Sequence, residues 1–184
     1  MRPRADAVPG EDAPGVPRAA TPRPRYVVSG CLAGLACRYD GGSNPCPRVV
    51  RLVAAGLAVP LCPESLSGLP VPRPPCEQSA SGPERDVIRV HSRDGRDLTA
   101  AFIQGAERAF RAARALGCRE AILKSRSPSC GVGQVYDGTF SRHLRPGDGL
   151  WTRLLREAGF TLWTEESLPP EDGASACPGP GAGR

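Results

Sequence analysis

Short apolar runs that alternate with helical patterns constrain the fold of this chain more than any other feature. Strands are predicted over 25–30, 57–61, 87–90, 120–124 and 160–164, helices over 47–56, 99–116 and 149–158, and a hairpin-like stretch around 136–138. Strands separated by helices of this length form βαβ units, and the strands of such units pair in parallel. We therefore predict an α/β domain with a mostly parallel sheet and flanking helices, a Rossmann-like arrangement.

Proline-rich segments mark the ends of this domain. Six of the 21 prolines lie in residues 1–24 and four in 169–184. Neither end can bury enough apolar surface to offset the entropy lost on ordering. We predict a disordered extension over 1–24, one domain over 25–168 and a disordered tail over 169–184. Six more prolines lie in 63–83, where we expect a stiff extended wall, because proline fixes its own φ and restricts the preceding residue.

Charge and hydropathy exclude several classes of protein. The formal net charge is +5, but the basic residues are scattered along the chain instead of clustering as a nucleic-acid stripe would. The sequence has no run of 18 apolar residues and no apolar segment typical of a secretory signal near its start. We expect no membrane span and a cytoplasmic location, where thiols stay reduced.

The cysteines carry the strongest functional signal. The chain contains eight of them: Cys31, Cys37, Cys46, Cys62, Cys76, Cys118, Cys130 and Cys177. In a reducing compartment, we expect metal ligands or catalytic thiols in place of a disulfide framework. The absence of a C-x-x-C pair removes the signature of zinc ribbons, thioredoxin-like redox pairs and clustered ferredoxin sites. A metal site in this chain must therefore combine cysteines from distant segments.

Three cysteines share one kind of position. Cys31, Cys62 and Cys130 each lie at or just beyond the carboxyl end of a predicted parallel strand, where open α/β sheets bind their ligands. We expect the three thiols to converge. Ligation by thiolates without histidine favours an iron–sulfur cluster, and a cubane held by three cysteines leaves one iron open. A cysteine after a buried strand is also common as a small apolar core residue, so this alternative stays open.

Polar residues accompany these thiols. Glu64 lies two residues after the second of them and is placed to act as a general acid or base, or only to begin a helix. Ser125, Ser127 and Ser129 surround Cys130, and their hydroxyls either belong to the site or only form a turn.

Ordered motifs along the chain resemble a known bacterial family. The motifs are Ser29-Gly30-Cys31-Leu32-Ala33-Gly34, Arg38-Tyr39-Asp40-Gly41, Cys62-Pro63-Glu64, Gly68-Leu69-Pro70, Pro72-Arg73-Pro74, Leu123-Lys124-Ser125-Arg126-Ser127-Pro128-Ser129-Cys130-Gly131, Tyr136-Asp137-Gly138-Thr139-Phe140 and Pro146-Gly147-Asp148-Gly149. They are similar to the signature blocks of the family once called domain of unknown function 523, to which thiouracil desulfidase belongs. The resemblance covers about 25–165. Gly30 stands where many relatives have alanine, and Cys76 stands where a residue without a thiol is expected.

The resemblance implies a cofactor, a substrate and a set of site residues. By motif, Cys31, Cys62 and Cys130 would bind a 4Fe-4S cluster whose fourth iron takes the sulfur of a thiolated pyrimidine such as thiouracil. Desulfurisation without net redox change would then give uracil and sulfide. Glu64 and Ser127 match the positions implicated in this chemistry.

Two other classes of protein stay open on the residues alone. A non-catalytic iron–sulfur sensor would have the same cluster and no need of Glu64. A metal-independent thiol redox enzyme would use Cys37 or Cys46, which lie in the same loop as Cys31 and otherwise line the site or pack in the core.

Overall fold

The computed structural model describes residues 23–81 and 87–170. The predicted extension over 1–24 and the predicted tail over 169–184 lie almost wholly outside these residues. No helix within 23–81 or 87–170 has the length and the apolar composition needed to cross a bilayer.

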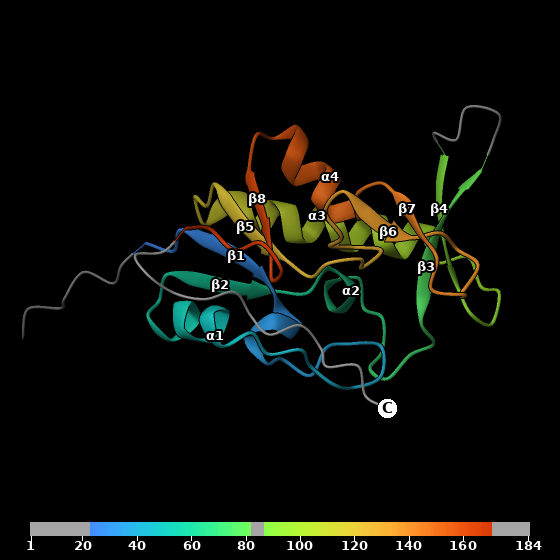
Figure 1. Ribbon diagram of the computed structural model, residues 1–184, viewed down its shortest axis with the longest axis horizontal. Coiled ribbons are helices and arrows are strands. Elements are labelled where there is room, and N and C mark those ends of the chain that lie inside the picture. The colour runs from blue at the N-terminus through green and yellow to red at the C-terminus, as the bar shows by residue number, and fades with distance from the viewer. Residues whose placement is uncertain (1–22, 82–86, 171–184) are drawn as a thin grey trace, which may run out of the picture.

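Four parallel strands form the central sheet in the order β2-β1-β5-β8 (Figure 1). The strands are β1 (Tyr26–Ser29), β2 (Ala58–Leu61), β5 (Glu120–Leu123) and β8 (Thr161–Thr164). Tyr26 of β1 pairs with Ala58 on one side and with Glu120 on the other. The prediction of a mostly parallel sheet is confirmed. Because β2 and β5 lie on opposite sides of β1, a ligand-binding crevice is expected beyond the carboxyl end of β1.

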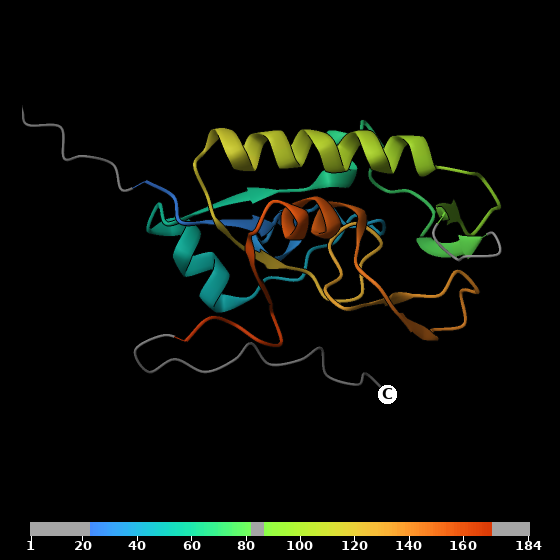
Figure 2. The ribbon, with the colours of Figure 1, turned by 90° about the horizontal axis from the view of Figure 1, so that it is seen from above.

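Helices cover both faces of this sheet, as predicted (Figure 2). They are α1 (Pro47–Ala54) on one face and α3 (Thr99–Ala115) with α4 (Leu150–Glu157) on the other. Alternate residues of each strand point to opposite faces, so Val27 and Ala121 pack against α3 and α4, while Val28 and Ile122 pack on the side of α1. Leu155 of α4 is fully buried, and such a side chain stabilises the fold by roughly 2 kcal/mol.

The segment between β2 and α3 differs from its prediction. The stiff extended wall expected over 63–83 is wrong at its start, where the chain forms a short helix, while the strand that follows is extended as expected. Pro63 begins helix α2 (Pro63–Leu66), because proline at the first helical position loses no hydrogen bond. After Pro75 the chain has free backbone N–H groups again, and β3 (Cys76–Ser81) pairs in antiparallel fashion with β4 (Val87–Ser92). The proline-rich stretch between α2 and β3 forms no helix or strand.

A second small hairpin lies beside the first. Strands β6 (Gln134–Tyr136) and β7 (Leu144–Pro146) are antiparallel, which confirms a hairpin near 136–138 but with a loop that continues to residue 143. Gly138 has φ 93° and lies against β3, where an added Cβ would be 3.0 Å from the Cβ atom of Ser79. A glycine is needed for this close approach. The loop after β6 therefore packs on β3.

Candidate active site

The three cysteines predicted to converge line one cavity. Cys31 lies in the 3-10 turn η1 (Gly30–Ala33) that follows β1, and Cys62 directly follows β2. Cys130 lies in the loop after β5. The cavity has a volume of about 560 Å³ and is also lined by Glu64 and Ser127. All five residues of the predicted site therefore share one cavity at the carboxyl end of the sheet, although the roles assigned to them stay predictions.

Burial and mutual contact act on the thiols of this cavity. Cys130 is 5 % exposed, and its burial raises the pKa of its thiol well above the ordinary value, with the charges of Cys62 and Glu64 acting in the same direction. The pKa of Cys62 is raised chiefly by its contact with the Cys37 thiol and then by burial. A bound metal replaces these protons, because thiols coordinate metals as thiolates. The positive charge of the metal then favours the thiolate over the protonated thiol.

The donor set fits an iron–sulfur cluster. Over the described part of the chain, no three His, Cys, Asp or Glu side chains are arranged to hold a single metal ion. A cubane makes a different demand, because each thiolate binds a different iron atom. The lining offers soft thiols and, among the described residues, no histidine. This ligand chemistry suits iron–sulfur clusters better than zinc.

Glu64 is held in place by two other side chains. It lies in the first turn of α2, and its Oε2 atom accepts hydrogen bonds from Arg73 through Nη2 and, at 3.0 Å, through Nε. The Ser129 hydroxyl donates to Oε1 at 3.2 Å. The Arg73 side chain is only 3 % exposed, so this ion pair is largely shielded from water. Glu64 therefore lies in the first turn of a helix and also lines the cavity, while its role as a general acid or base stays a prediction.

Arg73 is a residue that the sequence analysis did not assign to the site. Besides its bonds to Glu64, the guanidinium donates to the carbonyl oxygens of Pro70 and Cys37, each at 3.2 Å. These bonds occupy its planar fork and fix it between the loop after β1 and the helix α2. The signal in the sequence was an arginine enclosed by Pro72 and Pro74, a rigid setting for a charged side chain.

The three serines around Cys130 have different partners. The Ser127 hydroxyl oxygen accepts the backbone N–H groups of Ser129 at 3.1 Å and of Cys130 at 3.2 Å, and the hydroxyl contacts the Cys130 thiol. Ser129 donates to Glu64, as described above. Ser125 instead binds the Glu165 carboxylate through its N–H at 2.9 Å and its hydroxyl at 3.2 Å. Ser127 and Ser129 therefore contact the site residues directly, and Ser125 supports its edge.

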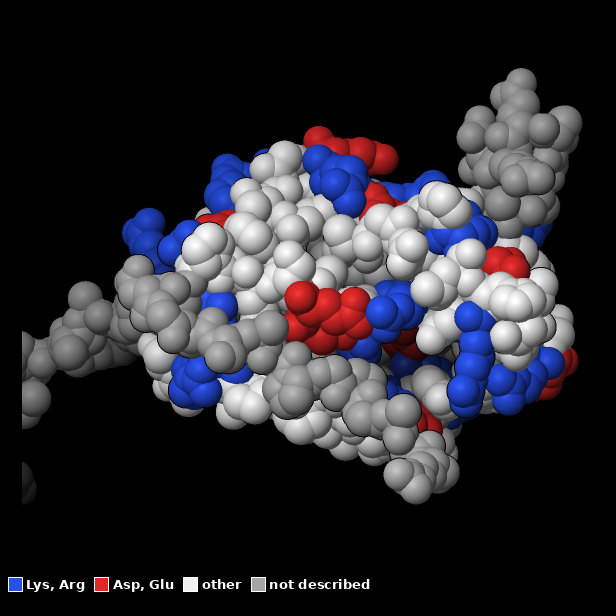
Figure 3. All heavy atoms as spheres, viewed as in Figure 1, with Lys and Arg blue, Asp and Glu red and all other residues white. Residues whose placement is uncertain are grey.

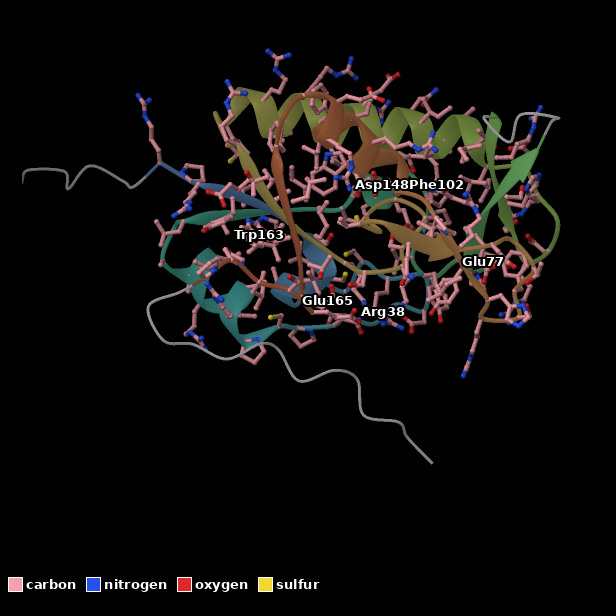
Figure 4. All side chains as sticks on the ribbon, turned by 45° about the horizontal axis from the view of Figure 1, so that its top comes forward. Arg38, Glu77, Phe102, Asp148, Trp163 and Glu165 are labelled. Atoms are coloured by element: carbon pink, nitrogen blue, oxygen red, sulfur yellow. The ribbon has the colours of Figure 1, made fainter. Side chains whose placement is uncertain are left out.

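Cationic side chains surround the mouth of the cavity, and several of them are paired. Arg38 binds Asp40 through Nε at 3.0 Å and Nη2 at 2.7 Å, while Lys124 forms an ion pair with Glu165. On the face shown in Figure 3, basic and acidic side chains stand next to one another around a hollow in the surface. Arg38 and Glu77, labelled in Figure 4, reach the cavity from the loop after β1 and from β3. The pairing leaves this rim mixed in charge.

The remaining cysteines fall into two groups. Cys37 and Cys76 line the cavity, and the pKa of each thiol is raised to about 11, by contact with Cys31 for the first and by burial for the second. Cys46 is 2 % exposed and packs in the core cluster of α1, and Cys118 packs in the cluster of α3 and α4. Cys46 is bonded in a disulfide, which the sequence analysis did not expect. Cys177 lies outside the described residues.

Comparison with known proteins decides the family. The family described as 2-thiouracil desulfurase matches residues 26–167 of this chain. The chain belongs to the 2-thiouracil desulfurase family. The match covers the whole sheet and every residue of the predicted site, so the resemblance inferred from the ordered motifs is confirmed.

Two relatives of this 2-thiouracil desulfurase family member illustrate the similarity. An uncharacterized protein of Bacillus subtilis (strain 168), YbbK, is 36% identical over 146 residues, which cover 77% of this chain and 96% of that protein. The solved structure of TudS, named as a 4Fe-4S-dependent thiouracil desulfidase, is 41% identical with a TM-score of 0.68. That match covers 77% of this chain and 91% of TudS. The fold and the family therefore agree.

Proposed function

We propose that this protein is an iron–sulfur-dependent desulfidase that converts a thiolated pyrimidine such as thiouracil into uracil and sulfide. The observation that carries the proposal is the presence of Cys31, Cys62, Cys130 and Glu64 around one cavity. Membership of the 2-thiouracil desulfurase family and similarity to a 4Fe-4S-dependent thiouracil desulfidase support the choice of substrate and cofactor.

The cofactor of this proposal is a 4Fe-4S cluster bound through the thiolates of Cys31, Cys62 and Cys130. When bound, the cluster supplies an iron atom that acts as a soft Lewis acid toward a thiocarbonyl sulfur. The three thiols come from neighbouring strands β2, β1 and β5, whose hydrogen-bonded register fixes the spacing of the loops that carry them. The rigid sheet edge holds the ligands without a local cysteine motif.

Glu64 is assigned to proton transfer. Its Oε2 atom is engaged by Arg73, whereas Oε1 has the Ser129 hydroxyl as its partner at 3.2 Å. In this arrangement the carboxylate keeps acceptor capacity at Oε1 for a water molecule in the cavity. The carboxylate accepts a proton as the water oxygen attacks the thiocarbonyl carbon, and the sulfur leaves as hydrogen sulfide. One water is consumed for each sulfur released, and no electron is gained or lost.

Ser127 is assigned to substrate orientation. Its oxygen already accepts two backbone N–H groups, so the hydroxyl contributes to the site as a donor. A donor beside Cys130 can bind a ring carbonyl or ring nitrogen of a pyrimidine. The same two N–H bonds hold the turn that carries Cys130. Ser127 therefore helps to position both the ligand Cys130 and the substrate.

The proposal also includes the partner and the location of the protein. A small thiolated pyrimidine is the partner, which fits a cavity of about 560 Å³. Free thiols in that cavity suit the reducing conditions of the cytoplasm, where we propose the protein acts.

Anaerobic reconstitution followed by a sulfide-release assay tests the proposal. The full chain is loaded with iron and sulfide under anaerobic conditions, its iron content is determined, and thiouracil is added without any reductant or oxidant. We expect four irons per chain and stoichiometric formation of uracil and sulfide. A loaded protein that leaves thiouracil intact contradicts the proposed reaction, and a chain that retains no iron contradicts the proposed cofactor.

A further inference from the structure

A fourth thiol lies among the proposed cluster ligands. Cys37 is 9 % exposed and lines the same cavity as Cys31 and Cys62. Contact with the Cys31 thiol raises the pKa of the Cys37 thiol, and contact with the Cys62 thiol lowers it. The packing is tight here, because a Cβ atom added to Gly30 would lie 3.4 Å from the Sγ atom of Cys37 and 3.5 Å from the Cβ atom of Cys62. Cys37 therefore bridges two ligands that come from different strands.

The backbone of Cys37 is fixed by the groups that hold Glu64. Its carbonyl oxygen accepts the Arg73 guanidinium at 3.2 Å and is contacted by the Cys62 thiol at 3.9 Å. Its N–H donates to the carbonyl of Leu35 at 2.8 Å. Main-chain hydrogen bonds thus hold the Cys37 side chain beside the two ligand thiols.

We propose that Cys37 is a positioning residue that donates its S–H hydrogen bond to the ligand sulfur of Cys31 or of Cys62. The inference rests on the cluster of the proposed function. Cys37 is not a fourth ligand, because a fourth thiolate would close the iron that the thiocarbonyl sulfur needs. Since Cys37 lines the same cavity as the two ligand thiols, its hydrogen would be able to reach either sulfur when these bind a cluster.

Hydrogen bonds to ligand sulfurs are a principal means by which proteins tune iron–sulfur clusters. A donor stabilises the more electron-rich reduced cluster more than the oxidised one, so removal of the donor makes reduction harder. The reduction equilibrium therefore reports this bond directly, even though the proposed desulfidation involves no net electron transfer. A residue with a purely packing role would leave that equilibrium unchanged.

The test compares three variants with the wild-type holoprotein. Cys37→Ala removes the donor, and Cys37→Ser restores a hydroxyl donor at the same position. The matched control is Cys118→Ala, another buried free cysteine, whose thiol donates to the Pro24 carbonyl at 3.5 Å and does not line the cavity. Each reconstituted protein is analysed for iron content, for the reduced fraction of the cluster at a set of fixed potentials, and for the rate of cluster loss in air.

We expect Cys37→Ala to keep the iron content of the wild type. Its ratio of reduced to oxidised cluster at a given potential should fall about tenfold, which corresponds to about 59 mV for a one-electron couple. Cluster loss in air should be several-fold faster. Cys37→Ser should recover most of the shift in potential, and Cys118→Ala should behave as the wild type.

Three results would overturn the inference. An unchanged potential in Cys37→Ala shows that the thiol only packs, and loss of iron in both Cys37 variants shows that it is a ligand. An equal shift in Cys37→Ala and Cys118→Ala shows a general effect of removing a buried thiol. If the wild-type chain itself takes up no cluster, the proposed function fails together with the inference. A Cys37 that proves to be a ligand contradicts the open iron of the proposed function as well, whereas an unchanged potential or a general effect of removing a buried thiol leaves the function standing.

Discussion

Replacement of Arg73 by alanine is a sharp test of how the site is held together. The variant removes the guanidinium that binds the Glu64 carboxylate and the carbonyl oxygens of Pro70 and Cys37. It leaves a carboxylate in the cavity with only the Ser129 hydroxyl as its described partner. The variant therefore breaks a largely buried ion pair and leaves the negative charge of Glu64 without its cation.

The exposed fractions of the Arg73 and Glu64 side chains determine how much stability the variant should lose. Removing one partner of a buried pair costs about 3–5 kcal/mol, because the remaining charge is left without compensation. The Arg73 side chain is 3% exposed and that of Glu64 is 16% exposed, so the orphaned carboxylate regains some contact with water. We take the lower limit, about 3 kcal/mol in the free energy of unfolding. For a chain of this length, this corresponds to a fall in Tm of about 9 °C.

Thermal and urea unfolding of the apoprotein measure this loss. The matched control is Arg96→Ala, which breaks a pair with Asp94 whose side chains are 59% and 48% exposed and should leave Tm within experimental error. A double variant, Arg73→Ala with Glu64→Ala, removes both charges and should be less destabilised than the sum of the two single variants. An Arg73→Ala protein as stable as the wild type would refute the view that this pair organises the site.

Three further variants test neighbouring parts of the account. Glu64→Gln keeps the shape of the side chain and removes its proton-accepting group, so the cluster spectrum should persist while sulfide release per mole of cluster falls ~100-fold; near-normal turnover would remove the catalytic role. Ser127→Ala should also keep the cluster, with a smaller loss of turnover, and an equal or larger loss would point to chemistry beyond orientation. Glu77→Ala removes a carboxylate that accepts the N–H groups of Gly138 at 3.1 Å and Phe140 at 2.9 Å, so urea unfolding should show a loss of about 3 kcal/mol. An unchanged urea midpoint would contradict that role for Glu77.

Much of the fold could be predicted because its strands are short apolar runs with clear ends. The run over 25–30 ends at Gly30, and the helix over 99–116 is followed by Gly117, which adopts φ 72° in the structure. These local signals locate elements to within a residue or two. The prediction for 63–83 was wrong at its start because proline is compatible with two backbone conformations. Its fixed φ suits both an extended chain and the first turn of a helix, and Pro63 takes the second.

The candidate site was predictable where it depended on topology. Parallel strands end at one edge of a sheet, and this rule alone placed Cys31, Cys62 and Cys130 around one cavity. Arg73 was missed, because its position depends on contacts between segments whose relative positions no local pattern reports. Cys37 was named as a residue that lines the site or packs, and the cavity lining includes it.

The serines illustrate the same limit at short range. Ser125, Ser127 and Ser129 alternate along one loop, and the sequence does not distinguish their surroundings. In the folded chain Ser125 binds Glu165, Ser127 caps the turn of Cys130, and Ser129 binds Glu64. The local backbone decides this division, since Arg126 between the first two serines adopts φ 64°. A left-handed arginine is not expected from sequence and redirects the hydroxyls that flank it.

Iron bound per chain in the Cys130→Ser variant tests the central claim most directly, which is that thiols from three strand ends hold one cluster. The variant replaces a soft thiolate by a hard hydroxyl in a site that is otherwise unchanged. After anaerobic reconstitution we predict that most of the iron is lost and sulfide release is abolished. Cys118→Ser, a buried thiol away from the cavity, should keep the wild-type iron content and activity. Wild-type iron content in Cys130→Ser would contradict the account.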